Sequence, residues 1–225
     1  MENSLHRQLK ALYCADAAQQ EVQVDGYRID AVDGERLIEI QSSSLGAIRD
    51  KIRDLLTSHD VLVVKPLAAR KYLVKRKRKR GRVTSSRYSP VRETIYHLFD
   101  DLVHFVTVFP HPRLTLEVLL VEQEEHRLPA PKRWYRSKGF RVEDRTLRSV
   151  QERRTLHNLD DVLALLPEGL PATFSTGDLA TAADIPRWLA QKMAYCLRET
   201  EAIRLVGKRG NALLYEVAET TTRVA

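Results

Sequence analysis

Cysteine is almost absent from this chain. Its 225 residues include only Cys14 and Cys196, which lie far apart in the sequence. Two isolated cysteines provide neither a disulfide framework nor the paired spacing of a zinc site, and this usage fits the reducing cytoplasm. No apolar run reaches about 18 residues, so no transmembrane helix is expected. The polar and charged start, MENSLHRQLK, does not match a secretory signal peptide.

Motifs of several enzyme classes are also missing. The chain contains no glycine-rich phosphate loop and no Gly-x-Ser-x-Gly, and its 7 histidines lack the spacing of metal ligands. Positive charge, in contrast, is in excess, with 37 Lys and Arg against 30 Asp and Glu, for a net charge of +7. A basic balance favours a polyanionic partner, nucleic acid before a membrane surface, because the basic residues lack an accompanying amphipathic apolar face.

The residues 21–41, EVQVDGYRIDAVDGERLIEIQ, predict three short strands joined by turns at Asp25-Gly26 and Asp33-Gly34. Counting pairs outward from the second turn places Asp30, Glu39 and Gln41 on one sheet face, with Asp30 and Glu39 as diagonal neighbours within about 8 Å. Two carboxylates at that spacing are able to share one divalent ion. The opposite, apolar face is formed by Ile29, Ala31, Ile38 and Ile40. A solvated sheet face with two ordinary acids remains the alternative.

The order of the predicted helices and strands resembles that of a known protein family. A helix over 2–15, this three-strand unit, a helix over 44–57 and a buried strand over 61–65 follow one another, with Asp30 and then Glu39-Ile40-Gln41 on the strands. The arrangement resembles the PD-(D/E)XK nuclease superfamily. The resemblance implies an α/β (α+β) fold with a restriction-endonuclease-like mixed sheet flanked by helices. Gln41 departs from the family pattern, since Lys usually stands there, although some restriction enzymes of the superfamily carry Gln and remain active.

The same resemblance implies a catalytic site. Asp30, Glu39 and Gln41 would be the catalytic residues, and Mg²⁺, or Mn²⁺ in its place, would be held by the two carboxylates and the Ile40 carbonyl. Glu2 and Glu21 are further candidate ligands; Glu2 is equally suited to complement a helix dipole, and Glu21 to a solvated strand end. Gln41 is able to hydrogen-bond a water but not to offset charge.

The most basic stretch covers residues 70–90. It predicts either a disordered tract or localisation signal, or a β-hairpin with Gly81 near its turn that would follow DNA phosphates. We expect a strand over 114–123 beyond a helix over 91–109. The nucleic-acid contacts predicted in this half of the chain are Lys65, Lys75, Arg76, Lys77, Arg78, Lys79, Arg80 and Arg82.

The C-terminal sequence predicts a helix, a turn, a longer helix and two strands around a basic turn, an order that resembles a winged helix-turn-helix. Such modules bind DNA through an outward helix face and the wing, and others serve as protein-interaction or dimerisation modules. The predicted DNA contacts here are Arg187, Gln191, Tyr195, Arg198, Lys208, Arg209 and Asn211.

These observations predict a nuclease-like domain over 1–128 with a basic hairpin insertion, a connecting region over 129–166 and a winged-helix domain over 167–225. The expected function is that of a metal-dependent endonuclease that cleaves double-stranded DNA, with a homodimer as one possible assembly and no membrane contact. The alternative is a catalytically idle, nuclease-like DNA-binding regulator or adaptor.

Overall fold

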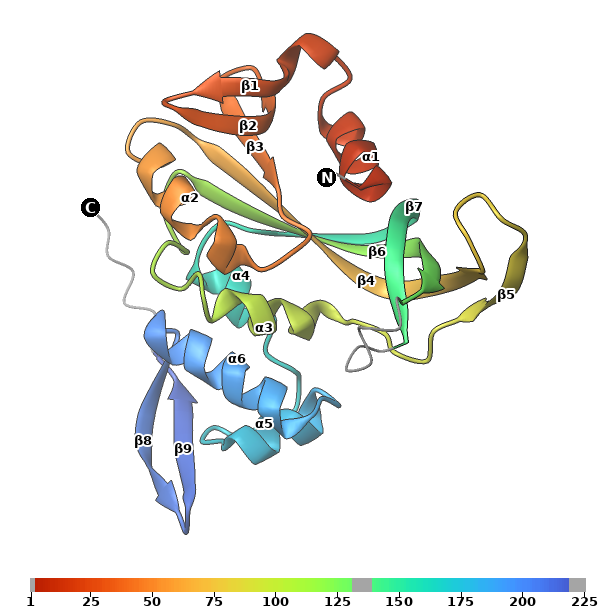
Figure 1. Cartoon of the computed structure of the whole chain (residues 1–225). Helices are drawn as coiled ribbons and strands as arrows, with labels where there is room; N and C mark the ends of the chain where they lie inside the picture. The colour runs from red at the N-terminus through yellow and green to blue at the C-terminus, as the bar shows by residue number, and fades with distance from the viewer. Residues whose placement is uncertain (1–2, 131–138, 219–225) are drawn as a thin grey trace.

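A seven-stranded mixed sheet forms the centre of the computed structural model, which describes residues 3–130 and 139–218 (Figure 1). Strand β4 lies in the middle and pairs in parallel with β3 and β6, and the remaining pairs are antiparallel. One edge of β4 pairs with β3 near its start and with β5 near its end. The strands are β1 (Gln20–Val24), β2 (Tyr27–Asp33), β3 (Arg36–Ile40), β4 (Val61–Arg76), β5 (Val83–Tyr88), β6 (Leu114–Pro129) and β7 (Phe140–Leu156).

Helices cover both faces of this sheet, which explains why β3 and the start of β4 are apolar on both sides. Helix α1 (Ser4–Tyr13) buries Leu5 and Leu9 against one face, together with Ala31, Ile38 and Ile40. Helices α2 (Arg49–Leu55) and α3 (Leu98–Leu102) pack on the other face. The α+β class with a mixed sheet flanked by helices is therefore confirmed.

The two tight turns that join the first three strands place their Asp-Gly pairs differently. Val24 pairs with Tyr27, so Asp25 and Gly26 form the first loop, and both have positive φ, 49° and 81°, as a type I′ turn requires. At the second turn Asp33 itself pairs with Arg36, so the loop residues are Gly34 and Glu35. The turn therefore lies one residue later than predicted, and the pairing register differs by two residues, so that Asp30 is in register with Glu39 instead of diagonal to it. The turn moves because Gly34, with φ of 59°, occupies the first loop position, where the other common hairpin turn favours glycine.

The predicted connecting region over 129–166 is wrong over most of its length. Residues 140–156 form β7, a 17-residue strand that pairs with β6 at the sheet edge. Only α4 (Leu159–Leu163) and the loop that follows connect the sheet to the C-terminal residues. The sequence predicts at most a short strand near 139–144, because β7 is mostly exposed and charged, without a regular apolar alternation.

The helix expected over 91–109 is shorter than predicted. It consists of a 3₁₀ turn at Ile95–His97 followed by α3, and turns replace the remaining residues. A similar 3₁₀ turn, Leu45–Ala47, precedes α2 in place of the first part of the helix expected over 44–57.

The C-terminal unit, residues 167–218, has the predicted order of elements: α5 (Thr176–Ala182), α6 (Arg187–Glu199), β8 (Ile203–Arg209) and β9 (Ala212–Val217). Its core is continuous with that of the sheet, since Leu189 and Met193 of α6 belong to the same cluster of buried residues as Phe99 and Phe105. Lys192 of α6 also forms an ion pair with Asp100 of α3. Within the described ranges no helix has the length and apolarity needed to cross a membrane.

Candidate active site at a fork between two strands

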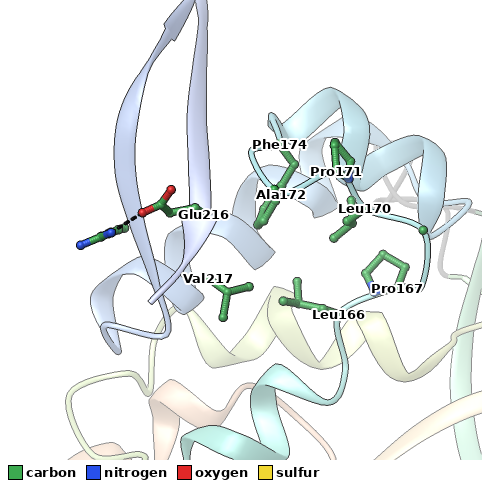
Figure 2. A pocket seen from close by; sticks show the side chains of 10 residues that line it. Leu166, Pro167, Leu170, Pro171, Ala172, Phe174, Glu216 and Val217 are labelled. Atoms are coloured by element: carbon green, nitrogen blue, oxygen red, sulfur yellow. Dashed lines mark hydrogen bonds and ion pairs between the residues drawn. The ribbon is translucent and has the colours of Figure 1, made fainter. Parts of the chain in front are cut away.

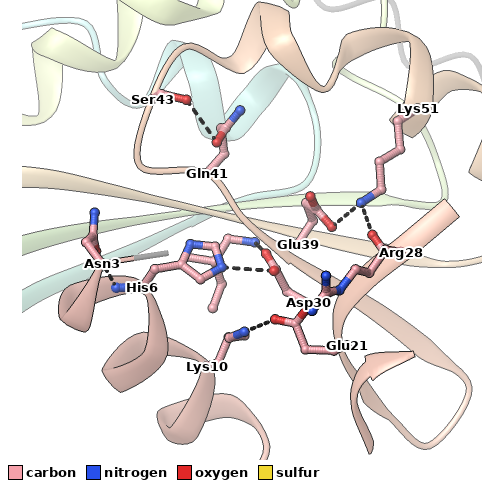
Figure 3. Close-up of polar contacts among 11 residues, drawn as sticks. Asn3, His6, Lys10, Glu21, Arg28, Asp30, Glu39, Gln41, Ser43 and Lys51 are labelled. Carbon is pink, nitrogen blue, oxygen red and sulfur yellow. Dashed lines mark hydrogen bonds and ion pairs between the residues drawn. The ribbon is translucent and has the colours of Figure 1, made fainter. Parts of the chain in front are cut away.

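Asp30 lies where β2 and β3 separate. The last pair between these strands joins Ala31 to Ile38. If the ladder continued, the Ile40 N–H would face the backbone of Ile29, but it donates instead to Oδ2 of Asp30 at 2.8 Å. The Asp30 carboxylate thus replaces a backbone carbonyl of β2 as the acceptor for Ile40, because a buried backbone N–H needs a partner. This hydrogen bond fixes the carboxylate in the opening between the two strands (Figure 3).

Helix α1 brings a histidine to the same carboxylate. His6 Nε2 lies 2.9 Å from Oδ1 of Asp30. The helix is held in position from the far edge of the sheet, because Asp144 of β7 accepts hydrogen bonds from the Ser4 N–H at 2.9 Å and the Ser4 hydroxyl at 2.6 Å. Burial alone would raise the pKa of Asp30, but the hydrogen bonds from His6 and Ile40 outweigh it and keep that pKa below its usual value.

Glu39 lies beside Asp30, and its pKa is shifted in the opposite direction. Burial and the neighbouring negative charge of Asp30 raise the pKa of Glu39. Lys51 of α2 opposes this shift: its Nζ donates to Glu39 Oε2 at 2.6 Å and to the Arg28 carbonyl at 2.5 Å. Figure 3 shows the two carboxylates together, with His6 on the α1 side and Lys51 on the α2 side.

Glu21 completes the acidic group from the neighbouring strand. The pairs Gln20–Ala31 and Val22–Ile29 flank it, so Glu21 stands opposite Asp30, as the first turn predicts. Its carboxylate forms ion pairs with Lys10 of α1 and with Arg28. Burial would raise the pKa of Glu21, yet these cations lower it overall. Glu2, the other additional candidate ligand, lies outside the described residues.

Gln41 contributes an amide to the same place. It lines, with Asp30, Glu21 and Arg28, a cavity of about 430 Å³ that we call the fork cavity. The Gln41 side chain donates to the Ser44 carbonyl at 2.9 Å and accepts from the Ser43 hydroxyl at 3.2 Å. The structure therefore brings Asp30, Glu39 and Gln41 close together at the end of β3, with Glu39 turned toward Lys51 and Gln41 toward the loop before α2.

Lys65, predicted to contact phosphate, is placed differently. Its side chain is only 4% exposed, and its ammonium group pairs with Asp101 at 2.6 Å and donates to the Ser43 carbonyl at 2.5 Å. A cation that is buried and satisfied in this way joins β4, α3 and the loop after β3, and it has no open path to a phosphate. The predicted contact is wrong because a lysine at the end of a central strand is covered by the helices on that face.

The other predicted nucleic-acid contacts lie at the surface in two groups. The basic stretch forms the expected hairpin, since Tyr72 to Arg76 of β4 pair with Val83 to Tyr88 of β5. The predicted contact residues of this hairpin have exposed side chains, except Arg76, which is half-buried. They are Lys75, Arg76, Lys77, Arg78, Lys79, Arg80 and Arg82. The second group is exposed on α6 and the β8–β9 turn, and comprises Arg187, Gln191, Tyr195, Arg198, Lys208, Arg209 and Asn211.

A separate pocket of about 480 Å³ lies between the loop after α4 and β9 (Figure 2). Its walls are mainly apolar, with Leu166, Phe174 and Val217 among them, and Arg204 and Glu216 form an ion pair at its side. It contains none of the predicted catalytic residues, so the fork remains the candidate active site within the part of the chain that the structure describes.

Two residues of the fork were missed in the sequence. His6 lies within the predicted helix 2–15 and Lys51 on the charged face of the helix 44–57, and neither position carries a local signal of proximity to Asp30 or Glu39. Within residues 3–130 and 139–218, no group of three or more His, Cys, Asp or Glu side chains is arranged to hold a metal ion.

Known proteins similar to this chain have no described activity. A family model described as "Domain of unknown function (DUF8091)" matches residues 3–157, which contain the sheet and the fork and end directly after β7. An uncharacterized protein of Treponema pallidum (strain Nichols) is 30% identical over 181 residues, which cover 80% of this chain and 71% of that protein. No solved structure matches the chain.

Proposed function

The chain belongs to the DUF8091 family, and we propose that it is a metal-dependent endonuclease that hydrolyses DNA phosphodiester bonds at the fork between β2 and β3. One observation carries the proposal. Asp30 and Glu39, two neighbouring carboxylates whose pKa values are shifted in opposite directions, lie where two strands diverge, and Asp30 lines the fork cavity. Neighbouring acids with shifted pKa values beside a cavity are typical of a functional site.

The donor set suits Mg²⁺, or Mn²⁺ in its place. Asp30, Glu39 and the Ile40 carbonyl would hold the ion, with Glu21 as an additional oxygen ligand, because hard cations prefer oxygen donors. When bound, the ion would supply a Lewis acid and lower the pKa of a coordinated water. Both carboxylates also have protein partners, Asp30 the imidazole of His6 and Glu39 the ammonium group of Lys51.

Lys51 supplies the positive charge that Gln41 lacks. It comes from α2 and not from β3, but its ammonium group reaches Glu39 directly. In the proposed reaction Lys51 offsets negative charge at the phosphate, and Gln41 orients a water through its amide. This division of roles would allow the site to work with a glutamine where the resembled nuclease family carries a lysine.

The C-terminal unit would target the enzyme to duplex DNA as a winged helix-turn-helix. Arg187, Gln191 and Arg198 project from the exposed side of α6, where arginine and glutamine suit base edges in a major groove. Lys208 and Arg209 in the turn between β8 and β9 suit the phosphate backbone.

A second candidate function is that of a DNA-binding regulator or adaptor with an idle nuclease-like domain. It is favoured by the contacts within the fork, since His6 and Lys51 already occupy the two carboxylates. The two functions differ in one measurable respect, because the idle protein would bind DNA without any metal-dependent cleavage.

Cleavage of supercoiled plasmid in the presence of Mg²⁺ or Mn²⁺ tests the proposal. Asp30→Asn and Glu39→Gln keep the shape of each side chain but remove a ligand charge, and each should lower the rate about a hundredfold or more while DNA binding in EDTA is retained. Asp33→Asn and Glu35→Gln, exposed acids of the same hairpin, are matched controls that should cleave normally. Equal cleavage by all four variants would assign the activity to another site or a contaminant.

A further inference from the structure

A second cavity of about 430 Å³, here called the hairpin-tip cavity, lies next to the fork cavity. Asn3 lines both of them, at the start of α1. Four cationic side chains from two separate segments surround the hairpin-tip cavity, namely Arg7 of α1 and Arg76, Lys79 and Arg80 of the hairpin. Cations from distant parts of the chain repel one another, so their convergence on one cavity favours a bound anion.

The acids of this cavity do not neutralise these cations. Asp144 is occupied elsewhere, because it accepts from the Ser4 N–H, the Ser4 hydroxyl and the Arg145 N–H. These bonds outweigh burial and lower the pKa of Asp144. Glu143 is the other carboxylate of the lining. Among the residues that the structure describes, none of the four cations forms an ion pair.

Arg76 shows most directly that an acceptor is missing. Its Nε is buried and has no hydrogen-bond partner within the described ranges. A buried donor of a charged group that makes no hydrogen bond lowers the stability of the fold. Native proteins seldom contain such a donor unless a ligand, ion or water accepts from it. Arg76 is also one of the residues that line the cavity, so an anion bound there would lie beside this side chain.

We propose that the hairpin-tip cavity is a phosphate-binding subsite for the nucleic-acid strand whose scissile bond lies at Asp30. The identity of this strand rests on the proposed function, whereas the affinity for phosphate rests on the cavity itself. Arginine forks suit phosphate oxygens, and a lysine adds a point charge. With one phosphate held by Arg76 and Arg80 and the next part of the strand passing Asn3 into the fork cavity, the hairpin tip fixes where along the strand cleavage occurs.

The test is a binding measurement on the full chain in EDTA, so that cleavage plays no part. Fluorescence anisotropy would follow labelled oligonucleotides with a 5′-phosphate, a 3′-phosphate or only hydroxyl ends, and calorimetry would follow inorganic pyrophosphate. Arg76→Gln and Arg80→Gln should each weaken oligonucleotide binding about tenfold and lower the slope of log affinity against log salt by about one. Arg87→Gln removes the same charge from an exposed position of β5 in the same hairpin, outside the cavity lining, and it should change affinity much less.

The results distinguish a terminal phosphate from a backbone phosphate, and they test the subsite independently of the proposed nuclease activity. A loss confined to one phosphorylated end identifies a terminal phosphate, and an equal loss for all three oligonucleotides identifies a backbone phosphate. Both outcomes support the subsite, including in a protein that never cleaves. Arg80 is exposed, so its substitution by Gln removes no buried contact. If Arg80→Gln behaves like Arg87→Gln in affinity and salt slope, or if the wild type binds neither the oligonucleotides nor pyrophosphate, the subsite is refuted.

Discussion

Removing the ammonium group of Lys51 is the most informative perturbation of the fork. Lys51→Met keeps most of the side-chain length but leaves Glu39 beside Asp30 without its cation. Lys51 and Glu39 are 17% and 13% exposed and are joined at 2.6 Å, so solvent screens their attraction only in part. A hydrogen bond to a charged group contributes about 1.5–3 kcal/mol to stability. At about 2–4 °C per kcal/mol for a chain of this size, we expect the melting temperature to fall by about 3–12 °C at neutral pH.

The pH dependence of this loss has a definite sign. Burial and Asp30 already raise the pKa of Glu39, and without Lys51 it should rise further. The difference in melting temperature between Lys51→Met and the wild type is then largest above that raised pKa, where Glu39 is ionised. The difference becomes smaller as the pH falls through this pKa, because the carboxyl group takes up a proton. Thermal unfolding followed by circular dichroism between about pH 4 and 8 measures this trend.

Divalent ions should reverse the loss. If Asp30 and Glu39 hold Mg²⁺, the ion replaces the missing positive charge, so added Mg²⁺ should raise the melting temperature of Lys51→Met more than that of the wild type. Arg53→Met on the same helix is the control, because its pair with Asp50 is more than half exposed on both sides and contributes little. An unchanged melting temperature in Lys51→Met would refute the electrostatic account, and a variant that Mg²⁺ does not stabilise would refute the metal site.

The remaining predictions concern α1 and the C-terminal turn. Asp144→Ala should speed amide hydrogen exchange in α1, which loses its anchor to β7, and lower the melting temperature by a few degrees, about 1 kcal/mol, as for a lost helix cap. Since the pKa of Asp144 is lowered in the folded chain, its contribution is present above the usual value near 4 and should disappear as the pH falls through the lower one. Lys208→Ala should weaken duplex binding for all sequences about equally and reduce its salt dependence, and an unchanged anisotropy titration would favour a protein-docking role for the C-terminal unit.

Local chemistry was sufficient to predict many elements. Asp25-Gly26 forms its turn because both residues accept positive φ, and the resulting register places Glu21 opposite Asp30. The hairpin around Gly81 and the order of the C-terminal elements also follow from turn residues and apolar periodicity close by in the sequence. These features depend on interactions between residues a few positions apart, which a single sequence displays directly.

Features that depend on distant contacts were not predictable in this way. The length of the edge strand β7 is decided by its pairing with β6. The boundary of the C-terminal unit is likewise set by packing, because Leu189 and Met193 share a core with α3.

The candidate site combines both kinds of information. The sequence by itself determined that Asp30 and Glu39 lie on neighbouring strands of one hairpin, because the hairpin is local. Only the tertiary structure decided their chemistry: it placed His6 against one carboxylate and Lys51 against the other, buried Lys65, and opened the strands so that Asp30 accepts from Ile40. The pKa of a carboxyl group depends on burial and on charges that reach it through space, and these come from helices whose docking no local pattern encodes.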